Sequence, residues 1–237
     1  MSSIFYFKQF RIDQANCAMK VNTDGVLLAA LADIRSPLKI LDVGTGTGLI
    51  ALMLAQKYTS TTVHAVEIDQ NAANTALENF LNSPFSNRMV LSHCSIEDYL
   101  TNTEEQYDLI ISNPPFFINS LKSQNPEKGL ARHADLSFFN VLLTESVNHL
   151  NQTGQLYIIL PLDTAAMVKK IISGAGVLNV QKEILIHSFP GSKPHRTIMV
   201  MGFEKLDPVE ESMVIYERRD IYTSMYRNLL KDYLTIF

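Results

Sequence analysis

Four residues of unusual type, Asn113-Pro114-Pro115-Phe116, follow an apolar run that is typical of a buried strand. Asn113 offers a side-chain amide oxygen and Pro114 a backbone carbonyl, and both accept hydrogen bonds. Held by two stiff prolines, these acceptors can bind both N–H groups of an amine or amide and free its nitrogen lone pair. Phe116 can stack on a base turned out of a nucleic acid. The four residues predict a catalytic site for amino groups, although the stretch alone could also be a stiff turn.

A glycine-rich loop between Asp42 and Gly48 joins another apolar strand to a helix. Gly44, Gly46 and Gly48 have the spacing G-x-G-x-G, whereas dinucleotide folds use G-x-G-x-x-G and phosphate-binding loops add Lys-Ser/Thr. A loop without a phosphate grip favours a nucleoside cofactor that has no phosphates, and we predict S-adenosylmethionine. Asp42 is expected to order the loop and to face the methionine ammonium. By itself the loop could be a plain tight turn.

Three further side chains at strand ends are predicted to contact this cofactor. Glu67 ends the next strand about twenty residues after the glycines, where an acid accepts hydrogen bonds from both ribose hydroxyls. Asp69 competes for this role, but we expect it to cap the following helix. Ser95 follows the third strand, where a contact to the adenine ring is expected. Asn113 is counted among the cofactor contacts as well as the catalytic residues.

Strands that alternate with helices must position these residues. Apolar runs predict strands, and helical spacing with a glycine or proline stop predicts helices. The expected strands are 38–46, 61–69, 88–95, 107–113, 154–161, 180–190 and 195–205, and the expected helices are 49–58, 70–83, 137–150 and 163–176. The last segment, 218–237, is expected to be a strand or short helix followed by an amphipathic helix.

This order predicts an α/β fold: a doubly wound, Rossmann-like, seven-stranded, mostly parallel sheet with an antiparallel C-terminal strand and helices on both faces. In such sheets ligands bind beyond the carboxyl ends of the strands. The glycine loop, Glu67, Ser95 and Asn113 all fall at strand ends, so we expect them to meet at one edge.

Length and composition exclude several classes of protein. The 237 residues, 46% of them hydrophobic, suffice for one large domain, which we expect to span 1–237 as a core (36–237) with an N-terminal extension (1–35). No apolar run reaches the roughly 18 residues of a membrane helix, and the N-terminus lacks a signal-peptide layout. Cys17 and Cys94 lie far apart in the sequence and form neither a metal-ligand spacing nor a disulfide framework. We expect a cytoplasmic monomer without metal.

Charge is unevenly distributed along the chain. The net charge is −4, and residues 36–112 hold three Lys or Arg against nine Asp or Glu. Both flanks are mildly basic, so a polyanion is expected to meet the flanks.

The ordered set of glycine loop, Glu67 and Asn-Pro-Pro-Phe resembles the amino-group methyltransferases of the class I S-adenosylmethionine-dependent fold. The stretches 5–34, 40–56, 66–69, 113–116 and 131–133 together resemble the bacterial tRNA1(Val) (adenine(37)-N6)-methyltransferases over most of the chain. The most specific part is "KVNTDGVLLAA" (20–30). The resemblance implies tRNA as substrate and N6-methyladenosine as product. It also implies that Thr23, Asp24 and Gly25 help to close the cofactor pocket.

Two features depart from that family. An acid is frequent where this chain has Ser95, and the sequence pI of about 5.9 is low for an RNA-binding protein. Binding of tRNA must therefore come from local patches. The candidates are Lys8, Arg11, Lys20, Lys122, Lys128, Arg132, His133, Lys193, His195 and Arg196. Residues 120–133 are expected to form a polar, mobile substrate loop.

Several alternatives share part of this pattern. Methyltransferases that act on protein glutamine or ribosomal guanine N2 also carry Asn-Pro-Pro-aromatic loops, and those that act on DNA adenine N6 share the chemistry. The glutamine enzymes usually have a tyrosine in this loop and an N-terminal helical domain. The guanine enzymes often have longer, duplicated chains, and the DNA adenine enzymes usually add a target-recognition region. A non-catalytic RNA-binding protein of the same fold would not need Asn113, Pro114 and Phe116. The glycine spacing argues against a nicotinamide oxidoreductase.

Overall fold

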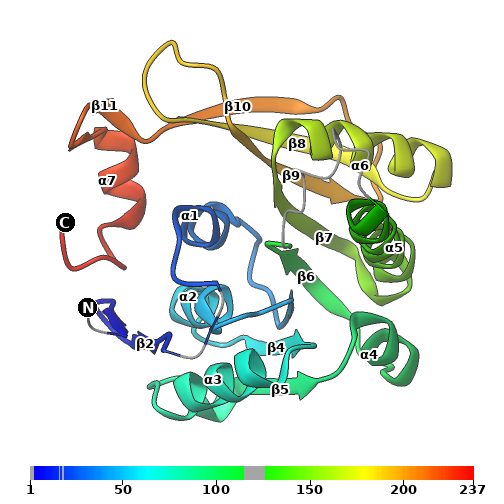
Figure 1. The fold of residues 1–237 in the computed structure, drawn as a ribbon, viewed down its shortest axis with the longest axis horizontal. Coiled ribbons are helices and arrows are strands. Elements are labelled where there is room, and N and C mark those ends of the chain that lie inside the picture. The colour runs from blue at the N-terminus through cyan, green and yellow to red at the C-terminus, as the bar shows by residue number, and fades with distance from the viewer. Residues whose placement is uncertain (1–2, 16, 18, 115–125) are drawn as a thin grey trace.

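The computed structural model describes residues 3–15, 17, 19–114 and 126–237, with the backbone alone for 126–136. Figure 1 shows the chain with its N- and C-termini on the same side of the molecule. Pro115, Phe116 and Lys122, which the sequence singles out, lie outside the described residues.

The central sheet contains eight strands in the described part of the chain. They are β3 (Lys39–Val43), β4 (Thr62–Glu67), β5 (Met89–His93), β6 (Tyr107–Ser112), β7 (Leu150–Leu160), β8 (Asn179–His187), β9 (Arg196–Gly202) and β10 (Val209–Val214). Their order is β10-β8-β9-β7-β6-β3-β4-β5. Only β9 runs antiparallel to its neighbours, β7 and β8. The predicted α/β class, with its mostly parallel sheet and one antiparallel strand, is confirmed.

The sheet has one strand more than the seven expected. The additional strand is β10, which pairs in parallel with β8 at the edge of the sheet. Its sequence, VEESMV, has four exposed residues at its start. Charged residues on a sheet edge hinder pairing with other chains, and here they also hide the apolar pattern that reveals a buried strand.

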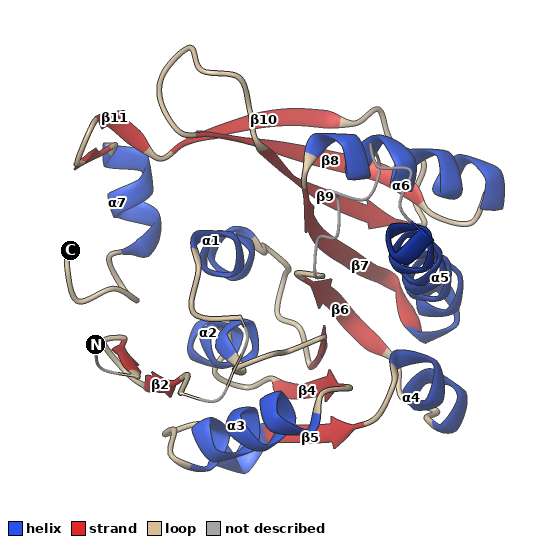
Figure 2. Cartoon of the chain, in the orientation of Figure 1, coloured by secondary structure: helices blue, strands red, loops and turns tan. Residues whose placement is uncertain are grey.

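Helices cover both faces of the sheet (Figure 2). The helical residues of one core come from α1 (Thr23–Leu31), α2 (Leu49–Lys57), α3 (Gln70–Leu81) and α7 (Ser224–Leu230). Those of the other come from α4 (Ile96–Asn102), α5 (Pro126–His149) and α6 (Leu162–Ala175). A single 3-10 turn, Ser86–Arg88, precedes β5 among the described residues. Because these strands are buried between two helical layers, they are apolar along most of their length, and the sequence therefore predicted them.

The predicted substrate loop 120–133 is wrong from Pro126 onward. There α5 begins, and it continues without a break to His149. Proline is favoured in the first turn of a helix, because its fixed φ suits the helix and its missing N–H has no helical partner to lose. The helix start at Pro126 was therefore disguised by the polar composition around it.

Two small antiparallel ladders complete the fold. They are β1 (Ile4–Tyr6) with β2 (Arg11–Asp13), and β11 (Tyr216–Arg218) with β12 (Ile221–Tyr222). Phe7, just after β1, forms an isolated bridge with Leu234 near the C-terminus. The backbone N–H of Lys8 donates to the carbonyl of Tyr233 (2.8 Å). The first and last segments of the chain are thus joined on the α7 side of the molecule (Figure 1).

Candidate active site

The glycine loop lies between β3 and α2, and backbone hydrogen bonds fix it to β4. The N–H groups of Gly44 and Thr45 both donate to the carbonyl of Val66, at 2.9 and 3.1 Å. Gly44, Gly46 and Gly48 have φ values of +70°, +58° and +82°. These values lie in the left-handed region that L side chains rarely adopt. The loop therefore needs glycine at all three positions.

The space around these glycines differs. A Cβ atom at Gly48 would lie 2.5 Å from Cε1 of Phe80, so this residue is glycine because α3 packs against it. A Cβ atom at Gly44 or Gly46 would have nothing within 4 Å. The backbone at Gly44 and Gly46 thus faces open space, where a ligand can approach closely.

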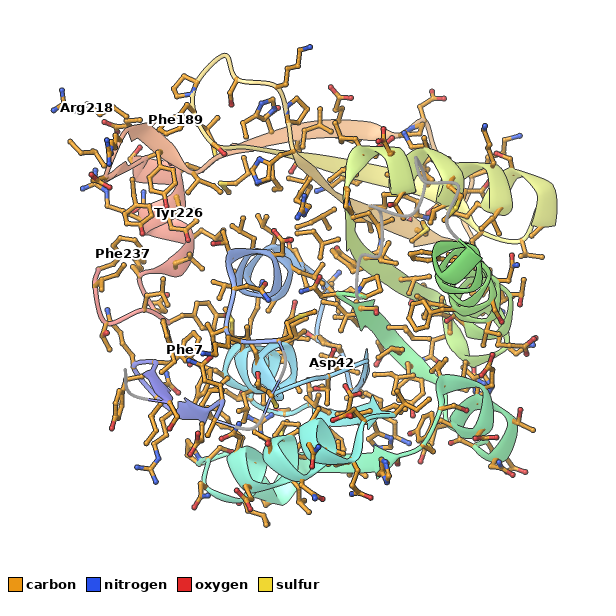
Figure 3. The ribbon with its side chains drawn as sticks, in the orientation of Figure 1. Phe7, Asp42, Phe189, Arg218, Tyr226 and Phe237 are labelled. Atoms are coloured by element: carbon orange, nitrogen blue, oxygen red, sulfur yellow. The ribbon has the colours of Figure 1, made fainter. Side chains whose placement is uncertain are left out.

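Asp42 orders the loop from beneath, as predicted. Its Oδ2 accepts hydrogen bonds from Thr45 Oγ1 (2.6 Å) and from the backbone N–H of Ala51 (3.2 Å). The side chain lies in the interior of the molecule (Figure 3) and has no exposed surface. Burial raises the pKa of this carboxyl to about 7. The predicted contact with a ligand ammonium stays a prediction, because the carboxyl does not reach the surface of the loop.

Glu67 stands at the end of β4 and holds the other side of the loop. Its Oε2 accepts from the N–H of Gly46 (2.8 Å) and its Oε1 from the N–H of Asp69 (2.9 Å). Each carboxylate oxygen has a further lone pair for a ligand hydroxyl. Asp69 caps α3 by accepting from the N–H of Ala72 (2.9 Å), as expected.

A hollow of about 330 Å³ opens beside Gly44, between the ends of β3, β4 and the start of α4. Ser95 lines it, and its Oγ caps α4 by accepting from the N–H of Asp98 (3.0 Å). Apolar side chains make up most of the wall. They are Val43, Val66, Ile68, Ile96 and Phe138. A volume of roughly 300 Å³ or more and an apolar lining suit a flat organic ring.

Asn113 lies on the other side of the glycine loop, directly after β6. The hydroxyl of Ser112 donates to the carbonyl of Val43 (2.8 Å), which ties the end of β6 to the end of β3. The Asn113 side chain is buried, and its Oδ1 has no hydrogen-bond partner among the described residues. Asn113 and Gly44 together line a narrow cleft of about 30 Å³. An unpartnered buried acceptor is costly, so this oxygen is suited to a ligand.

The start of α1 forms the wall opposite Asn113. The side chain of Asn22 caps α1 by accepting from the N–H of Gly25 (2.9 Å). A Cβ atom at Gly25 would lie 3.1 Å from Leu49 and 3.7 Å from Asn113 Nδ2, so glycine allows this close approach. Asp24 forms an ion pair with Arg196 of β9 (2.8 Å). Gly25 therefore lines the cleft beside Asn113, and the ion pair ties the preceding residue, Asp24, to β9; closure of the pocket by these residues stays a prediction.

The residues predicted to bind RNA fall into four groups. Arg11, Lys20, Lys193 and His195 are exposed, and Lys20 also lines the cleft beside Asn113. Lys8 Nζ donates to the carbonyl of Phe237 (2.9 Å), and Arg196 pairs with Asp24, so both have structural roles. Lys128, Arg132 and His133 lie in the first turns of α5, where only the backbone is described. Lys122 lies outside the described residues.

Sequence reasoning missed several residues of the site. Ile68 is 70% exposed directly after Glu67, and an apolar residue between two acids at a strand end was a usable signal. Phe138 reaches the hollow from the middle of α5, and no local pattern could have indicated that. The pairing of Asp24 with Arg196 joins residues 172 positions apart and was equally hidden.

Two absences are established for the part of the chain that the structure describes. It contains no helix long and apolar enough to cross a membrane. It also contains no group of three or more His, Cys, Asp or Glu that could hold a metal ion.

Comparison with known proteins supplies independent findings. The model of the family "Methyltransferase small domain" matches residues 17–186. A protein of Pedobacter heparinus, named tRNA1(Val) (adenine(37)-N6)-methyltransferase, is 45% identical over 100% of both chains. A protein of the same name from Bacteroides fragilis is 40% identical over 97% of this chain and 96% of its own. Among solved structures, a predicted O-methyltransferase from Agrobacterium tumefaciens superimposes with a TM-score of 0.68, at 19% identity, over 89% of this chain and 96% of that one.

Proposed function

Because this chain belongs to the tRNA1(Val) (adenine(37)-N6)-methyltransferase family, we propose that it methylates the N6 amine of adenine 37 in tRNA1(Val). It is an S-adenosylmethionine-dependent enzyme of the class I fold, as the sequence predicted. The observation that supports this chemistry is Asn113 Oδ1 beside the glycine loop, which is buried and has no hydrogen-bond partner among the described residues.

The residues present fit S-adenosylmethionine. The apolar hollow beside Gly44 suits an adenine ring, and Ile68 and Ile96 would hold its faces. Glu67 has free lone pairs for ribose hydroxyls. The open space at Gly46 and the cleft toward Asn113 suit the methionine chain. When bound, the cofactor supplies a methyl group on a sulfonium centre, which is a strong electrophile.

The protein's own part is to prepare the nucleophile. An adenine amine is a poor nucleophile because its lone pair is delocalised into the ring. Asn113 Oδ1 accepts a hydrogen bond from one N–H, and the Pro114 carbonyl accepts from the other. These bonds hold the nitrogen and favour the geometry in which its lone pair points out of the ring plane. Fixed acceptors stabilise the positive charge that develops on nitrogen without reorganisation during the reaction.

The remaining roles follow from this arrangement. Asp42 positions the loop, and Ser95 serves the adenine end as a helix cap rather than as an acid. Pro115 would stiffen the catalytic loop, and Phe116 would stack on the target base. Thr23 and Asp24, at the start of α1, would close the methionine end with the N-terminal extension 1–35. We propose that all of residues 1–237 act as one domain on tRNA, as a monomer in the cytoplasm.

Cofactor choice can be tested by thermal unfolding of the full chain. A ligand that binds only the folded state raises the melting temperature. S-adenosylhomocysteine is expected to raise it and NAD to leave it unchanged. Stabilisation by NAD alone would contradict the assignment of the cofactor site.

Substrate class can be tested by tritiated methyl transfer from S-adenosylmethionine. The acceptors are total tRNA, ribosomal RNA, DNA and protein from cells that lack this enzyme. Label in tRNA as N6-methyladenosine supports the proposal. Label in protein glutamine or ribosomal guanine would keep the amino-group chemistry and contradict the tRNA assignment.

A further inference from the structure

Four aromatic rings contact one another in series beside β11, β12 and α7, and Figure 3 labels the two at the ends, Tyr226 and Phe189. Tyr226 is buried and stacks on Tyr222, with centroids 4.9 Å apart and 7° between the ring planes. Tyr222 stacks on Tyr216 at 4.9 Å, and Tyr216 contacts Phe189 at 5.7 Å. The outermost ring, Phe189, is 40% exposed. We call Phe189, Tyr216 and Tyr222 the aromatic ledge.

A tight turn holds Phe189 in place. The N–H of Phe189 donates to Ser192 Oγ (3.1 Å), and the N–H of Ser192 donates to the Phe189 carbonyl (3.1 Å). His187 Nδ1 lies 2.6 Å from the Ser192 carbonyl, and Gly191 supplies the φ of +71° that the turn requires. An exposed ring fixed in this way loses little conformational entropy when it binds a partner.

The ledge lies at the same edge of the sheet as Asn113. The turn that carries Phe189 joins β8 to β9, and β9 begins where β7 reaches its carboxyl end, since Thr197 pairs with Leu160. Seven residues after Phe189, Arg196 forms the ion pair with Asp24 at the start of α1. Seven residues span at most about 25 Å. The ledge and Asn113 therefore lie at the same edge of the sheet, and Arg196 links the segment that carries Phe189 to the start of α1.

Positive charge surrounds the ledge on an otherwise acidic protein. Segments 187–196 and 214–223 hold four Lys or Arg (193, 196, 218, 219) against two acids (217, 220), although the chain carries −4. Arg219 lies 3.7 Å from Asp220, and Arg196 pairs with Asp24. Lys193 and Arg218 are exposed and form no ion pair with another described residue. Figure 3 shows Arg218 and Phe189 at the same corner of the molecule.

We propose that the aromatic ledge stacks an unpaired base of the RNA substrate near the target adenine, an inference that rests on the proposed function. Turning the target base out of its stack leaves neighbouring bases without a partner. The base stacks on the exposed ring of Phe189, and Lys193 and Arg218 contact the adjoining phosphates. Base–aromatic stacking tolerates any base, so the ledge supplies affinity and position, not sequence choice.

Equilibrium binding of an RNA hairpin with an unpaired loop tests the ledge on the full chain. Stacking on one ring strengthens binding by about 1–3 kcal/mol. Phe189→Ala is therefore expected to weaken hairpin binding about tenfold, and Phe189→Tyr to keep it within about twofold. Leu81→Ala, which removes an exposed apolar side chain from the end of α3, is the matched control. Hairpin affinity of Phe189→Ala equal to that of the control overturns the proposal.

A charge variant gives a second readout. Arg218→Ala is expected to reduce the slope of log affinity against log salt by about one, and Lys170→Ala, an exposed lysine on α6, is expected to leave it unchanged. An unchanged slope for Arg218→Ala would contradict the proposed contact of this residue with a phosphate.

The ledge and the proposed function can fail separately. Hairpin binding that depends on Phe189, without methyl transfer to any RNA, keeps the ledge and refutes the enzyme assignment. Methyl transfer with the same KM for RNA in Phe189→Ala and Leu81→Ala keeps the enzyme and refutes the ledge. No RNA binding by the wild type refutes both.

Discussion

Asn113 Oδ1 is buried without a partner in the described part of the chain, and an orphan acceptor of this kind costs about 1–3 kcal/mol. Full burial of the Asp42 carboxyl next to the same loop also destabilises the folded state when that group is ionised. Such costs persist where neighbouring structure enforces them, and they gather at functional sites. Both residues therefore give predictions at the scale of a single side chain.

Asn113→Ala removes one of the two acceptors that hold the amine. Loss of one fixed hydrogen-bonding group in other active sites lowers kcat about 100- to 1,000-fold, and we expect the same here. Affinity for S-adenosylhomocysteine, measured by calorimetry, should stay close to that of the wild type. Asn102→Ala, an exposed amide on α4, is the control. A parallel fall in cofactor affinity would show that Asn113 serves mainly to bind the cofactor.

The raised pKa of Asp42 predicts that the stability of the protein depends on pH. Its pKa is about 7 in the folded protein and near the ordinary value of 3.8 when unfolded. Between these values the folded state holds a proton that the unfolded state has lost. The free energy of unfolding should thus fall as the pH rises from about 4 to about 7. Asp42→Asn should flatten this part of the profile in urea titrations, and an unaltered profile would contradict the assignment.

At the scale of elements, the loop from β3 to α2 contains glycines that are required for two different reasons. Gly48 packs against α3, whereas Gly46 faces open space. Gly48→Ala would place a Cβ atom against Phe80 of α3 in an unfavourable φ region, so we expect a loss of about 2–4 kcal/mol in unfolding free energy. Gly46→Ala should lower the unfolding free energy by only about 1–2 kcal/mol, because the added Cβ atom causes backbone strain at positive φ but no clash.

The cofactor distinguishes these two variants further. A methyl group at Gly46 would enter the open space over the loop, so binding of S-adenosylhomocysteine should weaken about tenfold or more. Folded Gly48→Ala should lose less affinity, because its methyl group points toward Phe80. Wild-type affinity in Gly46→Ala would show that the cofactor does not pass over this residue.

The contact between α1 and β9 is a second test at this scale. Asp24 and Arg196 are both partly buried, and their ion pair fixes the start of α1 beside Asn113. Asp24→Asn and Arg196→Gln should each lower kcat/KM, and the double variant should lose little more than either, with a coupling free energy of about 1 kcal/mol. Arg196→Lys should restore part of the activity. Strictly additive effects in this double-mutant cycle would show that the two residues act separately.

At the scale of the whole molecule, buried periodic elements were predictable and exposed or non-local ones were not. The apolar runs of β3, β4, β6 and β7 and the placement of Glu67 and Asn113 at strand ends followed from the sequence. The first helix, TDGVLLAAL, was missed because it is apolar on nearly every side and shows no helical period. The edge strand β10 and the start of α5 were hidden by their polar composition, and the contribution of Phe138 to the hollow depended on contacts that no local pattern records.

The RNA-binding candidates stay predictions, and two of them also have contacts that the sequence did not reveal. Charge and position along the chain indicated Lys8 and Arg196, but each holds distant segments of the fold together. The family assignment did follow from the sequence, since it rested on ordered motifs at strand ends and not on counts of charge. Its confirmation leaves the target atom as the claim most in need of a direct test.

Methyl transfer to two otherwise identical tRNA1(Val) transcripts, one with adenine and one with guanine at position 37, is that test. We expect label in the adenine transcript alone, recovered as N6-methyladenosine, with an initial rate that falls at least about 100-fold in Asn113→Ala. Equal label in the guanine transcript, or undiminished label with Asn113→Ala, would contradict the claim that Asn113 prepares the N6 amine of adenine 37 for methylation.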